Sequence, residues 1–283
     1  MADKIEREHL YHAEATILSG RLELPLDQEI PPQAFAKISE RGGYLAQQSH
    51  NYRLESVISY RSAHTQVAGN RETKAGHGFS TLTTSVVEGL NILDVVTADR
   101  VVAQISTEHP LVGYVPHITF LGTRFENLRI AGHPVKLDLD LDIFGPKPKD
   151  DKPYTDDEGF LHRVSTQHDR LREQSRDHQP LSTELAERYN RQSFDDAETV
   201  ECSLVNQAEG SYPGRTFCHV IHVPDFGVIH LASVRLEHKD YHPESRVPRE
   251  THVHLDMIHA KLGCIATGTA KLAMARTNGT SHP

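Results

Sequence analysis

Strict alternation of apolar and charged residues is the feature of this sequence that most limits how it can fold. From Val135 to Ile143, aliphatic residues alternate with one lysine and three aspartates. Successive side chains of a β-strand point to opposite faces, so this run has one apolar face and one charged face. Such a pattern is typical of an antiparallel sheet that covers a core on one side only. It predicts that the Val and Leu face packs into the main core.

Strand-like runs recur along most of the chain. A second alternating run, Leu22 to Leu26, follows a turn signal at Ser19-Gly20. Further strands are expected at residues 54–60, 81–92, 95–105, 117–121, 125–130, 217–223, 228–236, 252–262 and 266–275. These runs are rich in Val, Ile and Thr, which pleated surfaces favour. So many strands without intervening helices predict an all-β fold, mainly an antiparallel sandwich or barrel.

One charged segment, residues 145–198, departs from this pattern and is predicted to be a partly helical insertion. Thr155 and Glu158 have the spacing of a capping box at the start of a helix. The apolar stripe that follows consists of Phe160, Val164 and Leu171. A second helix is expected over 183–191. Because the stripe is narrow, each helix can bury only one side. We therefore expect the segment to be dispensable for the β core and to matter for association.

The insertion divides the chain into three parts. Residues 1–144 are expected to form one β half and residues 199–283 a second half that completes a single core with the first. Residues 31–43 are ambiguous, since Pro31-Pro32 fits either the start of a helix or a loop.

Charge and hydropathy exclude some classes of partner. The net charge is −9, with 30 basic residues scattered among 39 acidic ones. Nucleic-acid binding needs clustered Lys and Arg, so no nucleic-acid partner is expected. No window approaches the roughly 20 apolar residues that span a bilayer, and the charged amino terminus has no signal-peptide pattern. We therefore expect no membrane association.

Cysteine usage bears on the cellular compartment. Cys202, Cys218 and Cys264 are an odd number of cysteines and lie far apart in sequence. This spacing favours reduced thiols over a disulfide framework. Together with the lack of a signal peptide, it predicts a cytoplasmic protein, while export by a route without a signal peptide stays open.

Residues 80–135 resemble a known class of β domain. The segments Ser85-Val86-Val87-Glu88-Gly89-Leu90-Asn91-Ile92-Leu93, Val95 to Ala103 and Phe125 to Val135 follow a strand-turn-strand pattern. This pattern is similar to that of the bacterial choice-of-anchor type β domains, which are poorly characterised and usually displayed at the cell surface. The resemblance implies a structural or adhesive β protein and no enzymatic activity. The sequence departs from these domains in lacking a signal peptide.

The strongest chemical candidate is a histidine pair on one predicted strand. His252, His254 and Asp256 alternate with apolar residues, so their side chains would share one face. Imidazoles in this arrangement can bind Zn²⁺ or another divalent ion with a further ligand from a neighbouring strand. His230 or His238 would supply that ligand. The alternative is a solvated sheet face with no bound metal. Standard nucleophile, zinc-helix and phosphate-loop motifs are absent from the sequence.

Three functional hypotheses follow. The leading one is a non-catalytic structural β protein that self-assembles as a homo-oligomer or binds a protein partner. The second is a metal-dependent enzyme or metal-binding protein built on the histidine pair. The third is a β-barrel or sandwich that binds a small ligand.

Overall fold

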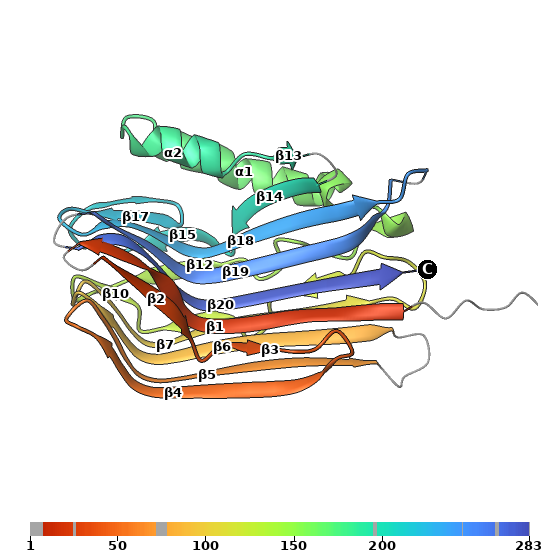
Figure 1. The fold of residues 1–283 in the computed structure, drawn as a ribbon. Coiled ribbons are helices and arrows are strands. Elements are labelled where there is room, and N and C mark those ends of the chain that lie inside the picture. Colours follow the sequence, from red (N-terminus) through yellow and green to blue (C-terminus); the bar gives the residue numbers. More distant parts are fainter. Residues whose placement is uncertain are drawn as a thin grey trace, which may run out of the picture.

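The computed structural model describes residues 8–24, 27–71, 78–194, 197–244, 246–263 and 266–282. Two antiparallel sheets pack face to face, and two helices lie on the outer face of one of them (Figure 1). The prediction of an all-β fold with a partly helical segment is confirmed.

The first sheet joins segments from both ends of the described chain. Its main path runs in the order β13-β14-β18-β19-β20-β1-β2, with β3 beside β1 and the pair β16-β17 beside β18. The long central strands are β1 (Glu8–Leu24), β18 (Gly227–Tyr241), β19 (Pro248–Gly263) and β20 (Thr267–His282). The shorter strands are β2 (Gln28–Gln33), β3 (Ala36–Lys37), β13 (Gln192–Phe194), β14 (Ala197–Ser203), β16 (Arg215–Phe217) and β17 (Val220–Val223).

The second sheet is built from consecutive segments of the chain. Its path is β11-β10-β7-β6-β5-β4, and β8 and β9 pair with β7. Its long strands are β4 (Gly43–Leu54), β5 (Ile58–Arg71), β6 (Phe79–Ile92) and β7 (Val96–His109). The short ones are β8 (His117–Thr119), β9 (Arg124–Glu126), β10 (Arg129–Ile130) and β11 (His133–Pro134). A separate two-stranded sheet pairs β12 (Lys136–Leu139) with β15 (Val205–Glu209).

A crease crosses the first sheet. At this crease the alternation of side chains along the long strands shifts, so that a different set of residues points to the core. In β18, Leu231 and Val234 are both core residues, and Ala232 between them has a left-handed φ of 44°. Ala232 lies between the register pairs Leu231–Ile258 and Ser233–Asp256. On β20, Ala273 lies between the pairs Asp256–Met274 and Ile258–Leu272 and has a φ of 48°. A left-handed residue shifts the alternation of side chains by one position, so different residues face inward on the two sides of the crease.

The second sheet carries a matching crease. In β6, Val87 and Leu90 both belong to the core, and Gly89 between them has a φ of 64°. A side chain at position 89 would press against the Cβ of Arg61 on β5. Glycine therefore suits this position because it tolerates both the left-handed backbone and the close neighbouring strand.

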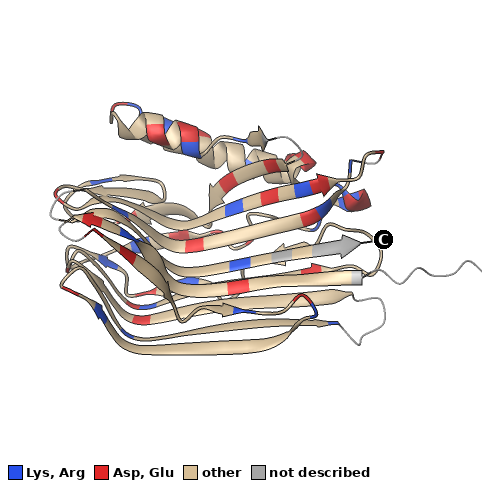
Figure 2. Cartoon of the chain, viewed as in Figure 1, with Lys and Arg blue, Asp and Glu red and all other residues tan. Residues whose placement is uncertain are grey.

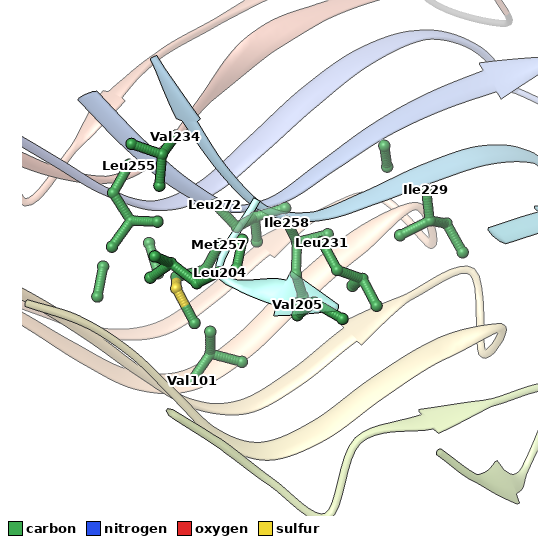
Figure 3. Close-up of a cluster of buried hydrophobic side chains, with 14 of the residues drawn as sticks. Val101, Leu204, Val205, Ile229, Leu231, Val234, Leu255, Met257, Ile258 and Leu272 are labelled. Atoms are coloured by element: carbon green, nitrogen blue, oxygen red, sulfur yellow. The ribbon is translucent and has the colours of Figure 1, made fainter. Parts of the chain in front are cut away.

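Apolar side chains from both sheets form one core between them. Figure 3 shows side chains of the first sheet, among them Leu255 and Met257, converging on the layer that contains Val101 of β7. Leu204 and Val205, which link β14 to β15, enter the same cluster. The interior of the described sandwich is thus filled with side chains, as expected for close-packed proteins. This packing gives no support to the hypothesis of a ligand inside the barrel or sandwich.

The helical segment contains α1 (Glu158–Ser175) and α2 (Leu181–Arg188), preceded by two short 3₁₀ turns, Lys149–Asp151 and Tyr154–Asp156. Asp157 caps α1, because its carboxylate accepts a hydrogen bond from the Phe160 amide at 2.7 Å. The predicted cap at Thr155 is wrong, since Thr155 lies in the second 3₁₀ turn. The predicted buried stripe of Phe160, Val164 and Leu171 is confirmed.

This segment contributes directly to the main core. Phe160 and Val164 from α1, together with Tyr154, belong to the same buried cluster as the two sheets. The ring of Phe160 lies 4.8 Å from that of Phe144, centroid to centroid. This packing argues against the expectation that the segment is dispensable for the β core. Two large aromatic residues, Tyr154 and Phe160, fill more of the core than the polar composition of the segment suggested.

Several strand and turn predictions need correction. The strands expected at 54–60, 125–130 and 217–223 are each interrupted, because each range spans the break between two observed strands, β4 and β5, β9 and β10, and β16 and β17. The strand expected from Val135 to Ile143 ends at Leu139, where the Asp140 carboxylate accepts a hydrogen bond from the Asp142 amide at 3.0 Å and stabilises a turn. Its apolar residues still pack against the core. Ser19-Gly20 is not a turn, because β1 continues through it, and a Cβ at Gly20 would collide with the carbonyl oxygen of Thr269 on β20.

Replacing Phe160 with alanine tests whether the helical segment belongs to the core. Phe160 is fully buried, and truncation of a buried Phe costs roughly 3–5 kcal/mol. We expect Phe160→Ala to lower the free energy of unfolding in urea by that amount. The control, Glu173→Ala on the exposed side of α1, should change it by less than about 0.5 kcal/mol. Equal stability of the two variants would show that the segment is dispensable.

Candidate functional site

The predicted histidine pair lies on the outer face of the first sheet. His252 and His254 both belong to β19, and their rings lie 6.5 Å apart, centroid to centroid. The intervening Val253 and the following Leu255 are buried in the core. The two histidines therefore share a face, as their spacing predicts. The Nε2 atom of His252 also lies 3.1 Å from a carboxylate oxygen of Glu250.

The other proposed ligands contact other side chains or backbone groups, although Asp256 stays on the same face as His254. His230 lies across the crease, paired in register with His259, and its Nδ1 lies 3.1 Å from the hydroxyl of Tyr189, the residue that follows α2. His238 is fully buried, and its Nε2 accepts a hydrogen bond from the Tyr154 amide at 3.1 Å. The Asp256 carboxylate forms an ion pair with Lys271 at 2.6 Å. Each of these side chains thus has a structural partner away from the pair.

Within the described ranges, no group of three or more His, Cys, Asp or Glu side chains is arranged to hold a metal ion. Binding of Zn²⁺ by His252, His254, Asp256 and His230 stays a prediction from the sequence. The pair alone offers two nitrogen ligands, whereas protein zinc sites use three or four protein ligands.

Charged residues on five strands form one row with His254 at its centre. Arg235 on β18 and Arg276 on β20 stand directly opposite His254 in the register. Glu201 on β14 extends the row beyond Arg235, and Glu14 on β1 extends it beyond Arg276. Figure 2 shows acidic and basic residues side by side on these strands. The sheet thus places one guanidinium group on each side of the His254 imidazole.

A basic hollow of about 240 Å³ opens over this row. It is lined by Arg188, Glu201, Ser233, Val234, Arg235, His254, Asp256, Lys271 and Arg276. A second hollow, of about 200 Å³, shares His254 and Arg276 with the first. Its remaining lining residues are His12, Ala13, Glu14, Lys37, His252 and Thr277.

Helix α2 closes one side of the basic hollow. Arg188 is the last residue of α2. Its Nε donates a hydrogen bond to the Glu201 carboxylate at 3.0 Å, and its Nη1 lies 3.0 Å from Nδ1 of His259. Both members of the ion pair are largely buried. Sequence patterns did not identify Arg188, Glu201 or Lys271, because their proximity depends on strand order and on the position of α2.

Burial changes the protonation of the predicted pair. Burial, with Arg276 next to it, lowers the pKa of His254 to about 4. Burial also lowers the pKa of His252, against the opposing effect of its hydrogen bond to Glu250. Desolvation disfavours the charged imidazolium, so both rings are neutral at neutral pH. Both rings therefore titrate at a pH below the 6.5 of an unperturbed histidine.

The described cysteines are shielded from solvent. Cys202 and Cys218 are free thiols and are both buried. Burial raises the pKa of Cys202 well above its usual range and that of Cys218 to about 11. Since the thiolate is the reactive form, neither cysteine is activated as a nucleophile. Cys264 lies outside the described residues.

Buried histidines make stability dependent on pH. Burial lowers the pKa of His219 and His238 to about 3, whereas an unfolded chain has histidines near 6.5. Between these values the unfolded chain binds protons that the folded chain does not, so stability falls as pH falls through this window. From pH 7.5 to 5.0, each such histidine should lower the free energy of unfolding by roughly 2 kcal/mol.

His219→Phe tests this effect at one position, since neither ring nitrogen of His219 has a hydrogen-bond partner. We expect the variant to lose about 2 kcal/mol of the decrease in unfolding free energy between pH 7.5 and 5.0. Urea unfolding of both proteins at the two pH values measures the difference. An identical decrease in the parent and the variant would contradict the assignment.

Comparison with known proteins gives a family without a known activity. No helix in the described part of the chain is long and apolar enough to cross a membrane. No curated protein and no solved structure matches the sequence. Residues 9–237 match the sequence model of a family described as a domain of unknown function, DUF8256. The match covers the second sheet, the helical segment and the first sheet up to β18, and it exceeds half of the chain, so the chain belongs to the DUF8256 family.

Proposed function

We propose that this chain is a non-catalytic β protein that assembles with further copies of itself through the edge strand β4. The observation that carries the proposal is the open side of β4. This strand has 12 residues and pairs with β5 on one side. No strand of the described chain pairs with its other side. Its free backbone groups are therefore available to another strand.

The other sheet edges are protected in ways that β4 is not. β2 contains Pro31 and Pro32, β11 has two residues including Pro134, and β13 has three residues. Prolines and short lengths discourage edge-to-edge pairing. β4 contains no proline and, from Gly43 to Tyr52, no Lys, Arg, Asp or Glu. Figure 2 shows it as an almost entirely uncharged ribbon at the border of its sheet.

The two halves of β4 differ in how the protein supports them. At its end, Tyr52 packs against the core and stacks on Tyr60 with ring centroids 5.0 Å apart. Toward its start, both faces are exposed, and Tyr44 and Leu45 are 66% and 36% accessible. A large exposed aromatic next to an open edge favours a surface that is covered in the assembled state.

A second copy of the chain is the partner that this edge fits. Two β4 strands related by a two-fold axis would pair antiparallel, and each would present the same residues to the other. The uncharged sequence avoids the like-charge repulsion that such symmetry would otherwise impose. The net charge of −9 lies elsewhere on the molecule and does not oppose this contact directly.

Other observations support a role without catalysis. Both described cysteines are inert, and the buried histidines have structural partners or closed surroundings. The resemblance of residues 80–135 to choice-of-anchor type domains also favours a structural protein. We propose a cytoplasmic location from the cysteine usage, and the scattered basic residues favour a protein partner over nucleic acid.

Lysines on β4 should disrupt the assembly. Ala46→Lys/Gln48→Lys places two charges on one exposed face of β4, where a two-fold partner would bring two more. We expect the parent to form dimers or larger species by light scattering and the double variant to be monomeric at the same concentration. The variant should melt as the parent monomer does, because these positions are exposed.

The matched control is Gln28→Lys on β2, an exposed position on the proline-protected edge. This variant should keep the parent's mass. A monomeric parent at the highest soluble concentration would refute the proposal. So would a double variant of unchanged mass.

A further inference from the structure

We infer that the basic hollow on the outer face of the first sheet binds a small oxyanion, such as a phosphate ester or a polycarboxylate, between Arg235 and Arg276. This site lies on the sheet opposite to β4, and the inference does not rest on the proposed assembly.

The balance of charge in the hollow favours an anion. Its lining contains four cationic side chains, Arg188, Arg235, Lys271 and Arg276, against two carboxylates. Glu201 is paired with Arg188 at 3.0 Å and Asp256 with Lys271 at 2.6 Å. Both carboxylates are therefore neutralised within the lining. Two positive charges, those of Arg235 and Arg276, remain.

These two arginines have only distant acidic neighbours. The guanidinium of Arg235 lies 3.9 Å from Glu237, which is closer to Lys239 at 3.1 Å. The guanidinium of Arg276 lies 3.8 Å from Glu14. Ion pairs of this length at exposed positions contribute little. The side chains are 47% and 41% accessible, so an incoming anion can reach both.

The sheet fixes the distance between the two arginines. Arg235 and Arg276 are the two cross-strand neighbours of His254, so one strand separates them. Adjacent strands lie roughly 4.8 Å apart, which places the two backbones about 10 Å from each other. Two side chains of this length can converge on one oxyanion above His254. The planar guanidinium groups match phosphate and carboxylate oxygens in pairs.

The central histidine keeps the site compatible with an anion at neutral pH. Its ring is neutral there and contributes no fixed charge that would vary in the physiological range. The size of the hollow and the closure of one side by α2 favour a small molecule over a polymer. The anionic surface of the whole protein also disfavours a polyanion.

Titration calorimetry of the full chain with inorganic phosphate, glycerol 2-phosphate and citrate tests the inference. We expect saturable binding of at least one of them. Preference for the first two identifies a phosphate ligand, and preference for citrate identifies a polycarboxylate. Binding should weaken as salt is added, because part of it is the attraction between exposed charges.

The test variant is Arg235→Gln/Arg276→Gln, which replaces both guanidinium groups with shorter, uncharged polar side chains. Its Kd for the bound anion should rise by about tenfold or more for each arginine lost. The control is Arg61→Gln on the second sheet, an arginine that is 70% exposed and also lies 3.9 Å from a glutamate. It should bind as the parent does. Thermal melting checks that all variants are folded.

Absence of binding for all three anions would overturn the inference. An unchanged Kd in the double variant, or the same loss in Arg61→Gln, would also overturn it. An equal loss of binding in Arg61→Gln would show that the net charge of the protein, and not this site, determines the affinity.

Discussion

The apolar layer between the two sheets is the interaction on which the rest of the structure depends. Both sheets bend, and a bent sheet can keep its apolar side inward only if the alternation of side chains shifts at the bend. Ala232 and Ala273 make this shift in the first sheet and Gly89 makes it in the second. Matching creases let the two surfaces stay in contact over their full length. A flat sheet of either sequence would expose part of its core face.

The same shift decides which polar residues meet on the outer face. Beyond the crease in β19, His259 points outward like His254, although the two lie five positions apart. His259 and His230 are then covered by α2, whereas His254 remains at the hollow. The outer face is thereby divided into a closed histidine region beneath the helix and an open basic region beside it. Helix α2 connects the two regions through Arg188, which contacts both Glu201 and His259.

Local patterns predicted the fold class because alternation and β-branched residues report directly on strands. They also placed His252 and His254 on one face, because the relative direction of two side chains on one strand does not depend on the neighbouring strands. The patterns failed at the creases and at Ser19-Gly20, where a close neighbouring strand and not a turn requires glycine. They also missed β4, because an edge strand that is exposed on both faces has no alternation to detect.

Arg235 and Arg276 could not have been found in this way. They lie 41 positions apart by their numbers, and they meet only because β18, β19 and β20 are adjacent in the sheet. The depth to which Phe160 and Tyr154 enter the core likewise depends on where the helical segment crosses the sandwich. Such contacts are properties of the topology and leave no local pattern in the sequence.

The pairing of β1 with β20 has a consequence for how the protein is made. β1 is synthesised early, yet its main partner follows only after residues 25–266. Until then, the apolar side of β1 that carries Ile17, Leu18 and Leu22 has only its short neighbours β2 and β3 in the sheet. Closing so long a loop is slow, and a strand left at an open edge is prone to wrong pairing. The nascent chain therefore passes through a stage in which the second sheet is complete while the first still lacks its centre.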